Sequence, residues 1–445
     1  MRRWLFNLVY FGILLFFLPM ILYRALRYGK YREGFKQKFL GRIPKRWAVL
    51  RSRPDLPGTK VVWFHAVSVG EVKLLRPLLQ KIRDHNDTTD DSPWCCAVST
   101  TSKTGMELAK QMFGNDWTVF YCPLDFSWAV ETALQRLKPD MLVLVEQELW
   151  PNLIESAKQR GVKTALINGR FGEGGYKRYL WIRPFVASLL RQFDLIAPQN
   201  EVYAGWFRRL GASCEVMQIT GSIKFDGANT DRNNPETQRF RKLAGITPED
   251  VVLLAGSTQH PEEAFAVECY EHLKRDFPQL RLIIVPRHPE RFDEVSAMLD
   301  NKEVFWERRS ALPETGKTDC ARILLVDTVG ELGGWWGTAT VAYVGGSMGK
   351  RGGQNMIEPA AYGSAVCFGP KTKNFSDIVE MMLRNNAAKV VHDQREMEQF
   401  VRRCLEEPGF AEQLGNNAQN LVRHQVGATR KTFEMLKALF DKTEV

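Results

Sequence analysis

The feature that most constrains the fold is a regular alternation of short apolar runs with longer amphipathic segments, which extends from Lys60 to Phe368. The amphipathic segments have helical spacing, as in Glu71 to Arg83 and Val130 to Leu137. Apolar runs without an alternating polar face are typical of strands buried on both faces of a parallel sheet. We therefore predict an α/β protein with strands at 61–64, 95–98, 119–121, 141–145, 164–167, 195–197, 251–255, 282–285, 323–326, 341–344 and 366–368.

A polar stretch, Asn229 to Glu236, divides this alternation into two parts. With 445 residues, 44% of them hydrophobic, the chain is long enough for two or three domains with cores of their own. Each part has the pattern of a doubly wound, Rossmann-like unit, and we expect the two units to face a cleft. We predict α/β domains over 28–228 and 237–425, and a C-terminal helix within 426–445 that can pack back on the first domain.

The N-terminal segment is apolar from Trp4 to Leu22. About 20 apolar residues in a helix are needed to cross the hydrocarbon core of a bilayer, so we predict a membrane-anchor helix over 1–27. A helix that lies in one leaflet is the alternative. No small-residue cleavage site follows the apolar run, and this disfavours a cleaved signal peptide.

Positive charge is concentrated directly after the apolar segment. Residues 24–53 contain eleven Lys or Arg and one Glu, so their net charge of +10 equals that of the whole chain. A basic block beside an apolar segment suits an anionic membrane surface, and the positive-inside rule places the domains that follow on the cytoplasmic side of the membrane. The chain has no helix-turn-helix, zinc-finger or aromatic RNA-binding motif, so we expect no nucleic-acid partner.

The cysteines give no sign of a disulfide framework or a metal site. All eight are scattered, without a CxxC pair, and this argues against both disulfides and structural zinc. An HExxH motif and a clustered set of His and Asp are also absent. We therefore predict a reducing compartment, and we expect neither a metal ion nor another cofactor.

A glycine-rich loop lies between the predicted strand 341–344 and a short helical segment that contains Glu358. Glycines let the backbone approach a ligand closely, and the free N–H groups at a helix start attract an anion such as a phosphate. Glu358 is placed to accept hydrogen bonds from both hydroxyls of a ribose. A tight turn that needs glycine only for its dihedral angles is the structural alternative.

Polar residues that a fold alone does not require follow two predicted strands of the first domain. Glu71 follows strand 61–64 at a helix start, where a carboxylate either complements the helix dipole or acts as general base for a hydroxyl. Glu146 directly follows the apolar strand 141–145, so its carboxylate is partly desolvated and needs a partner. Lys224 is a candidate for that partner, although most lysines are solvated surface charges.

The second domain carries such residues at four consecutive strand ends. Besides the glycine loop, these are Gly256 to Thr258, Pro286 to Arg291, and Asp327 to Leu332. Arginine suits forked binding of a phosphate, and ligands of α/β sheets bind at the carboxyl ends of the strands. We therefore predict a nucleotide site here. Neither GxGxxG in the first strand turn nor GxxxxGK[ST] is present, so a dinucleotide dehydrogenase and a P-loop NTPase do not fit.

Six motifs, in this order along the chain, carry a resemblance to a known family. They are HAVSVGE (65–71), EQELWPN (146–152), GSIKFD (221–226), VPRHPERF (285–292), DTVGEL (327–332) and VGGSMGKRGGQNMIEPAA (344–361). Nearly the whole chain resembles the 3-deoxy-D-manno-octulosonic acid (Kdo) transferases of lipopolysaccharide synthesis. The resemblance implies an inverting glycosyltransferase of the two-domain B-type fold, which moves Kdo from CMP-Kdo to a lipid A precursor (lipid IVA) without a metal ion.

The resemblance also implies roles for individual residues. Glu71 is implied as the base that deprotonates the acceptor hydroxyl, and Glu146 and Lys224 as groups that stabilise the transition state. The residues implied in CMP binding are Pro286, Arg287, Val329, Gly330, Glu331, Asn355, Met356, Ile357 and Glu358. Two positions depart from the family loop, Gln354 where a His is expected and Met356 where a Pro is expected, so Gln354 receives no role. A carboxylate at Glu146 repels a carboxylated sugar unless it is protonated or paired with a cation.

Two other classes of protein stay open. One is a different nucleotide-sugar glycosyltransferase or an epimerase on the same fold, and the identity of the donor separates it from a Kdo transferase. The other is a membrane-anchored binding protein that has lost catalysis. The presence of Glu71 and Lys224 argues against the second class.

Overall fold

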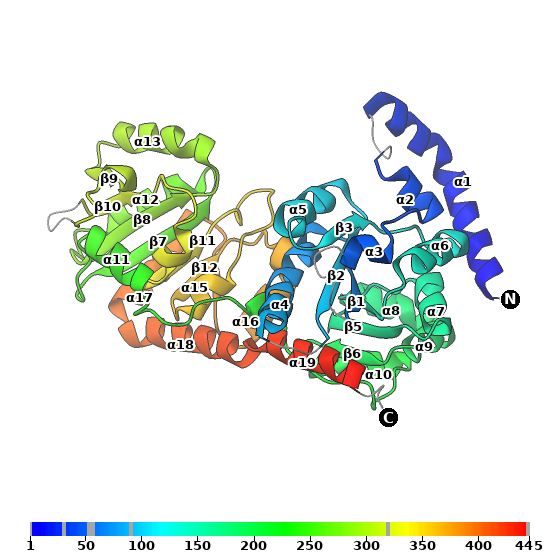
Figure 1. Cartoon of the computed structure of the whole chain (residues 1–445). Helices are drawn as coiled ribbons and strands as arrows, with labels where there is room; N and C mark the ends of the chain where they lie inside the picture. The colour runs from blue at the N-terminus through cyan, green and yellow to red at the C-terminus, as the bar shows by residue number, and fades with distance from the viewer. Residues whose placement is uncertain (1, 29–32, 51–57, 89–91, 317–320, 442–445) are drawn as a thin grey trace. The chain divides into compact units, whose positions relative to one another are not determined.

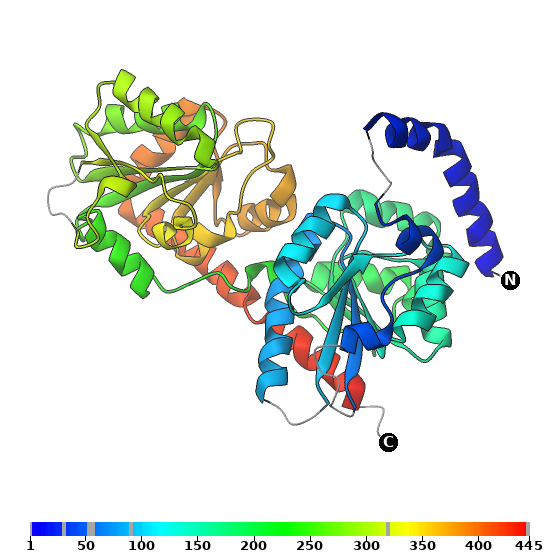
Figure 2. The same cartoon turned by 45° about the horizontal axis from the view of Figure 1, so that its top comes forward.

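The structure of the protein is a computed structural model that describes residues 2–28, 33–50, 58–88, 92–316 and 321–441. The chain divides into two compact units: unit 1 comprises Met1–Asp226 and Val426–Val445, and unit 2 comprises Gly227–Gln425. Each unit contains one parallel β-sheet with helices packed around it (Figures 1 and 2). The prediction of an α/β protein with two parallel sheets is confirmed.

The sheet of unit 1 has six strands in the order β3-β2-β1-β4-β5-β6, and all neighbouring strands are parallel. They are β1 (Lys60–His65), β2 (Trp94–Thr100), β3 (Thr118–Tyr121), β4 (Met141–Val145), β5 (Lys163–Gly169) and β6 (Leu195–Pro198). Strands β1 and β4 are neighbours, and the chain winds outward from them in opposite directions. Ligands of open α/β sheets bind at the carboxyl ends of the strands at such a switch in strand order. The segments that follow β1 and β4 therefore meet at the position where a site is expected.

Two apolar cores cover the two faces of this sheet. On β1, Val61 and Trp63 belong to one core, and Val62 and Phe64 belong to the other. Strands that are buried on both faces carry apolar residues at successive positions, and this explains the continuous runs in the sequence. Helices also supply residues to these cores: α3 (Arg46–Val49), α4 (Val69–Thr88), α5 (Lys103–Phe113), α6 (Ser127–Leu137), α7 (Pro151–Gln159), α8 (Glu173–Trp181), α9 (Arg183–Leu190) and α10 (Glu201–Leu210). The short helix α2 (Phe35–Leu40) has no buried residue.

Helix α19 (Ala428–Asp441) completes unit 1 from the far end of the chain. Its residues Phe433 and Leu436 are buried in the core that also contains the apolar face of α4. The start of this stretch is joined to the end of the first one, because Oδ1 of Asp226 accepts a hydrogen bond from the N–H of Gly427 at 2.6 Å. Unit 1 is therefore built from two stretches that are separated in the sequence by the whole of unit 2.

Helix α1 (Arg2–Tyr28) packs against α6 at the edge of unit 1 (Figure 1). Asn7 exchanges two hydrogen bonds with Ser127: Nδ2 donates to Oγ at 2.7 Å, and Oδ1 accepts from the backbone N–H at 3.0 Å. The hydroxyl of Tyr10 donates to the carboxylate of Asp125 at 3.0 Å. Asn7, which interrupts the apolar run in the sequence, is thus one of the residues that hold α1 against the rest of unit 1.

The apolar run forms a helix as expected, but the predicted membrane-spanning anchor over 1–27 is not supported. Among the residues that the structure describes, no helix combines the length and the apolar character needed to cross a bilayer. Polar Asn7 lies within α1, and arginines at both of its ends are part of the same helix.

The sheet of unit 2 has seven strands in the order β13-β12-β11-β7-β8-β10-β9, again all parallel. They are β7 (Val251–Thr258), β8 (Leu280–Pro286), β9 (Trp306–Arg308), β10 (Ile323–Leu325), β11 (Val341–Val344), β12 (Ala365–Phe368) and β13 (Lys389–Val390). The two strands that the sequence analysis did not predict, β9 and β13, are the edge strands. They are only 3 and 2 residues long and are not fully buried, so they lack an apolar run.

The helices of unit 2 surround this sheet (Figures 1 and 2). They are α11 (Pro235–Leu243), α12 (Glu262–Leu273), α13 (Phe292–Asn301), α14 (Leu332–Trp336), α15 (Ile357–Ala361), α16 (Ser376–Arg384), α17 (Gln394–Glu406) and α18 (Pro408–Gln425). Apolar side chains of α12, α13, α17 and α18 pack with those of the strands in one core. The short helices α14 and α15 follow β10 and β11, so their first residues lie at the carboxyl ends of the strands.

Candidate active site

Glu71 lies in the first turn of α4, just beyond the end of β1. Its carboxylate accepts hydrogen bonds from the backbone N–H of Val67 at 2.9 Å and from the hydroxyl of Ser68 at 2.7 Å. Burial raises the pKa of Glu71 to about 7 in spite of these bonds, and the nearby charges of Glu148 and Glu146 act in the same direction. A carboxylate that exchanges protons near neutral pH is suited to general base catalysis.

Glu146 directly follows β4 and has an unusual backbone conformation. Its φ is 61°, in the left-handed region that residues other than glycine seldom adopt. This turn directs the carboxylate to two cations: Oε2 lies 2.8 Å from Nε of Arg170, and Oε1 lies 3.7 Å from Nζ of Lys224. The ion pair expected between Glu146 and Lys224 is therefore present. The carboxylate is held between two positive charges.

Arg170 is a site residue that no motif predicted. It follows β5 directly, after Gly169, and β5 is the neighbour of β4 in the sheet. The same rule that drew attention to Glu146, a polar side chain at the carboxyl end of a buried strand, applies to Arg170 as well. Its ion pair with Glu146 depends on the pairing of β4 with β5, which the sequence alone does not reveal.

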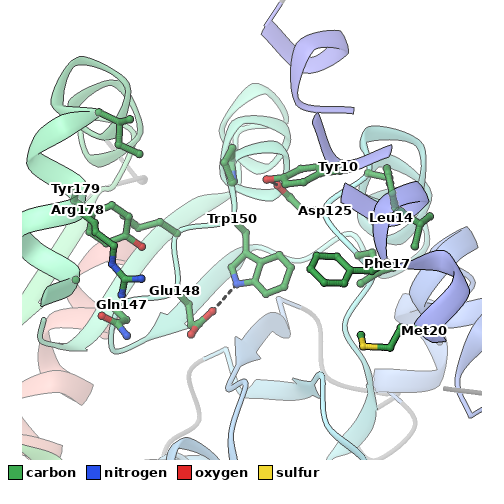
Figure 3. A pocket seen from close by; sticks show the side chains of 16 residues that line it. Tyr10, Leu14, Phe17, Met20, Asp125, Gln147, Glu148, Trp150, Arg178 and Tyr179 are labelled. Atoms are coloured by element: carbon green, nitrogen blue, oxygen red, sulfur yellow. Dashed lines mark hydrogen bonds between the residues drawn. The ribbon is translucent and has the colours of Figure 1, made fainter. Parts of the chain in front are cut away.

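A third carboxylate, that of Glu148, lies near the first two. Its Oε2 accepts a hydrogen bond from Nε1 of Trp150 at 2.8 Å (Figure 3). Burial raises the pKa of Glu148, and the charge of Glu146 adds to this shift. Unit 1 thus gathers three carboxylates and two cations at the carboxyl ends of its central strands, and Lys224 reaches this group from a single helical turn (Ile223–Phe225).

His65, the first residue of the HAVSVGE motif, is a buried structural residue. Its Nδ1 lies 2.9 Å from Oγ of Ser99, the residue opposite His65 on β2. Burial lowers the pKa of His65 to about 4, so the imidazole is neutral at physiological pH. We therefore assign His65 to positioning the start of the Glu71 loop and not to acid–base chemistry.

In unit 2, Asn355 and Glu358 form a hydrogen-bonded pair at the start of α15. Nδ2 of Asn355 donates to Oε1 of Glu358 at 2.8 Å, and Oδ1 of Asn355 accepts from the N–H of Ile357 at 3.1 Å. Burial raises the pKa of Glu358, whereas the hydrogen bonds and the charge of Arg287 oppose this shift. Arg287 and Glu358, both predicted at the nucleotide site, are therefore near enough for their charges to interact.

The other predicted nucleotide-binding residues differ in how much of their side chain is exposed. Pro286 is the last residue of β8. The side chains of Met356 and Ile357 are buried, with 0% and 3% of their surface exposed, so a contact with a nucleotide has to come from their backbone. Val329 is 77% exposed, and its neighbour Gly330 has a positive φ of 92° that favours glycine at this turn.

Glu331 already has a partner in the structure. Its carboxylate accepts two hydrogen bonds from Arg309, both at 2.9 Å, and one from the hydroxyl of Thr328 at 2.6 Å. These bonds to Arg309 and Thr328 lower the pKa of Glu331 although burial opposes the shift. Glu331 thus shapes the turn that contains Val329 and Gly330, and Arg309 was not predicted as part of it.

The first part of the glycine-rich loop has an acceptor within the protein for three successive backbone N–H groups. The N–H groups of Gly346, Ser347 and Met348 donate to the carboxylate of Glu262, at 2.7, 2.9 and 3.0 Å. Glu262 is buried at the start of α12, and it also accepts from the hydroxyl of Tyr343 at 2.9 Å. An internal carboxylate therefore holds this part of the loop, and phosphate binding at the start of α15 stays a prediction.

The structure brings several of the predicted residues together within each unit. Glu71, Glu146 and Lys224 gather in unit 1, and Arg287, Asn355 and Glu358 lie near one another in unit 2. Within the described ranges, no group of three or more His, Cys, Asp or Glu side chains is arranged to hold a metal ion. Metal-free transfer stays a prediction.

The two parallel sheets with their surrounding helices define the fold class. A glycosyltransferase from Rickettsia africae ESF-5 has a similar structure, with a TM-score of 0.51 at 14% sequence identity, over 86% of this chain and 99% of that chain. The architecture is therefore that of the B-type glycosyltransferases.

Sequence comparison shows the family. A sequence profile of the 3-deoxy-D-manno-octulosonic-acid transferases (kdotransferases) matches residues 35–227. The 3-deoxy-D-manno-octulosonic acid transferase of Bordetella pertussis is 32% identical over 425 residues, which are 93% of this chain and 94% of the relative. The transferase of the same name from Haemophilus influenzae is 30% identical over 391 residues, 87% of this chain and 88% of the relative. The chain belongs to the Kdo transferase family and is a glycosyltransferase.

Proposed function

We propose that this enzyme transfers Kdo from CMP-Kdo to a hydroxyl group of a lipid A precursor, lipid IVA, with inversion at the anomeric carbon and release of CMP. The observation that carries the proposal is Glu71, a buried carboxyl with a pKa of about 7 at the switch point of the unit 1 sheet, in a chain of the Kdo transferase family. Such a group is ionised for a large fraction of the time at neutral pH and still binds a proton readily.

The proposed reaction forms one carbon–oxygen bond and breaks another. The hydroxyl oxygen of the acceptor attacks the anomeric carbon of Kdo, and its proton passes to the carboxylate of Glu71. The bond between that carbon and the phosphate oxygen breaks, and its electron pair leaves with CMP. The hydrogen bonds from Val67 and Ser68 hold the Glu71 carboxylate in one orientation, which favours proton transfer from a fixed direction.

The ion pairs of Glu146 offset the electrostatic repulsion between its carboxylate and the carboxylate of Kdo. With Arg170 at 2.8 Å and Lys224 at 3.7 Å, the three side chains together carry a net charge of +1 when all are ionised. We propose that Glu146 fixes the positions of the two cations, which stabilise the negative charge that develops on the leaving phosphate or on the Kdo carboxylate.

In unit 2, we propose that Glu358 accepts hydrogen bonds from the ribose hydroxyls of CMP, with Asn355 as its support. Arg287 is suited to the phosphate because its guanidinium can donate two parallel hydrogen bonds. The turn at Val329 and Gly330 offers backbone groups to the nucleotide, while Glu331 holds that turn through Arg309. No step needs a metal ion, since cationic side chains can neutralise the leaving group.

We place catalysis at the cytoplasmic face of the inner membrane. The acceptor is a lipid in this proposal, and the net charge of +10 in residues 24–53 suits an anionic membrane surface. Large apolar side chains along α1 are exposed, among them Leu8, Phe11 and Phe16. Exposed apolar residues next to a basic block are typical of a protein that binds the membrane interface.

The experiment that tests the proposed function is transfer from CMP-Kdo, generated during the assay, to purified lipid IVA in detergent, with the product mass measured by mass spectrometry. We expect a mass gain of one or more Kdo residues. A lack of product, together with binding of a different nucleotide sugar, would instead support another glycosyltransferase or an epimerase on this fold.

Two variants separate the proposed roles of the two units. Glu71→Gln keeps the size of the side chain but removes the base, and we expect transfer to fall by about 10²- to 10⁴-fold with CMP binding retained. Glu358→Ala removes charged hydrogen-bond acceptors, and we expect CMP to bind roughly ten- to hundredfold more weakly. Calorimetric titration with CMP and the transfer assay distinguish the two effects; a Glu71→Gln enzyme with normal turnover would exclude Glu71 as the base.

A further inference from the structure

A large cavity in unit 1 has no role in the mechanism described so far. Its volume is about 990 Å³, and it lies between α1 on one side and the segments that lead into α7 and α8 on the other (Figure 3). Ligand sites commonly have volumes of about 300–1,000 Å³ and are mostly apolar with a few placed polar groups. The cavity is therefore large enough for a ligand of substantial size.

Most of the wall of this cavity is apolar. Helix α1 contributes Leu14, Phe17 and Met20, and the opposite side contributes Leu149, Trp150 and Ile182. Phe17 and Trp150 point toward one another in Figure 3. The α1 wall is attached to the rest of the unit, because the hydrogen bonds of Asn7 with Ser127 and of Tyr10 with Asp125 lie one to four turns before these residues. The cavity is thus formed by docked elements of one unit.

One end of the cavity is polar and adjoins the candidate active site. Gln147, Glu148 and Arg178 line it on the side away from α1 (Figure 3). Glu148 is also the carboxylate whose charge acts on Glu71. A bound ligand with an apolar part among the α1 side chains and a polar part near Arg178 would therefore have its polar part on the side of Glu71, the proposed base.

The apolar end adjoins exposed apolar surface. Phe16, next to Phe17 on α1, is 78% exposed, and Trp181, next to Ile182 at the end of α8, is 90% exposed. Large exposed apolar side chains are typical of surfaces that bind a lipid or detergent phase. Exposed apolar side chains are therefore direct chain neighbours of two residues that line the cavity.

We propose that this cavity binds one fatty acyl chain of the acceptor lipid, with the polar head group at the Gln147, Glu148 and Arg178 end. The inference rests on the proposed function, because it assumes that the acceptor is an acylated sugar. The apolar wall suits the hydrocarbon chain, and the guanidinium of Arg178 suits an anionic head group such as a sugar phosphate. The cavity would orient the acceptor so that its hydroxyl group approaches Glu71.

The test compares two substitutions on adjacent residues of α1. Leu14→Trp places a larger side chain in the cavity, and Leu15→Trp adds the same side chain on a neighbouring residue that is 52% exposed and does not line the cavity. Both variants are assayed in the full-length enzyme with lipid IVA in detergent and with the fully deacylated sugar bisphosphate. We expect Leu14→Trp to lower kcat/KM for lipid IVA at least tenfold and to leave transfer to the deacylated acceptor unchanged, while Leu15→Trp changes neither.

A cross-linking measurement gives an independent readout of the occupant. A lipid IVA analogue with a photoreactive diazirine in its acyl chains should label peptides that contain 14–20 or 147–151 in the wild type, and Leu14→Trp should suppress this labelling. The acyl-chain site would be overturned if both tryptophan variants lost activity equally, or if Leu14→Trp also lost transfer to the deacylated acceptor. Photolabelling confined to other surfaces would overturn it as well. Wild-type enzyme that transfers Kdo to neither acceptor would overturn the proposed function itself.

Discussion

At the scale of single residues, the environment of Glu71 decides its chemistry. An exposed glutamate has a pKa of about 4.3 and is a weak base at neutral pH. Burial raises the pKa of Glu71 to about 7, and the charges of Glu148 and Glu146 support this shift. The hydrogen bonds from Ser68 and Val67 limit the shift because they stabilise the ionised form.

This balance predicts the pH dependence of transfer. Because only ionised Glu71 can accept a proton, we expect kcat to rise about tenfold per pH unit below pH 7 and to level off above it. Ser68→Ala removes a hydrogen bond to the ionised form, worth about 1.5 kcal/mol, and so raises the pKa of Glu71 further. The rising part of the profile should therefore move to higher pH by roughly one unit. The measurement is kcat against pH with the supply of donor shown not to limit the rate; identical profiles for the two enzymes would contradict the assignment.

The residues of the site could be predicted only in part, and the reason is physical. Glu71 and Glu146 follow strands that the sequence reveals, so their positions at the sheet edge follow from the pattern. Arg170 and Arg309 were missed because each is recognised as a site residue only by its ion pair with a carboxylate. Those ion pairs depend on tertiary packing, which the sequence does not reveal. The acceptor of the glycine-loop N–H groups, Glu262, lies more than 80 residues away and was missed for the same reason.

At the scale of elements, the loop after β11 is held by one carboxylate. Glu262 accepts hydrogen bonds from three successive N–H groups, those of residues 346–348, and from the hydroxyl of Tyr343. All of these donors are buried or partly buried, so each loses its water on folding. The conformation of the loop therefore depends on a residue of α12.

We expect Glu262→Ala to destabilise unit 2 by about 3 kcal/mol or more, because several buried donors lose their acceptor at once. Amide hydrogen exchange at residues 346–348 should become fast, and the midpoint of urea unfolding should fall. Glu268→Ala on the same helix is the control, since Glu268 forms only a surface ion pair with Lys302 and should change stability by less than about 1 kcal/mol. Unchanged exchange at the loop in Glu262→Ala would contradict this role.

The strands were the most predictable elements, and the burial of each strand explains how closely its predicted ends agree with the observed ends. β4 and β11 begin and end at the predicted residues, because both are buried at every position. β5 continues beyond its predicted end through Asn168 and Gly169, which are polar or small but still buried. The edge strands β9 and β13 contain Glu307 and Lys389, so no apolar run predicts them.

At the scale of the whole molecule, unit 1 depends on the last helix of the chain. Leu436 has no exposed surface and lies in the core that α19 shares with α4 and the sheet. Each large side chain that is buried in this way contributes about 1.5–3 kcal/mol. The final stretch of the sequence is therefore part of the framework that positions Glu71 on α4.

We expect Leu436→Ala to destabilise unit 1 by about 2–5 kcal/mol, through lost burial and the cavity that the deletion leaves. Glu434→Ala changes an exposed residue of the same helix and should have little effect. Limited proteolysis followed by mass spectrometry reports which unit opens first: fragments from unit 1 should appear earlier in Leu436→Ala. Equal resistance of both variants would show that α19 is dispensable for this core.

The return of the chain to unit 1 also sets the order in which the protein can fold on the ribosome. Residues 1–226 leave the ribosome first, but α19 emerges only after all of residues 227–425 have been made. At about 5–20 residues per second, this delay is roughly 10–40 s. Throughout that time one face of α4 lacks its apolar cover, whereas every residue of unit 2 is available before the chain ends. Unit 1 is therefore synthesised first but completed last. Until α19 emerges, the uncovered apolar face of α4 is a surface that chaperones can bind and protect.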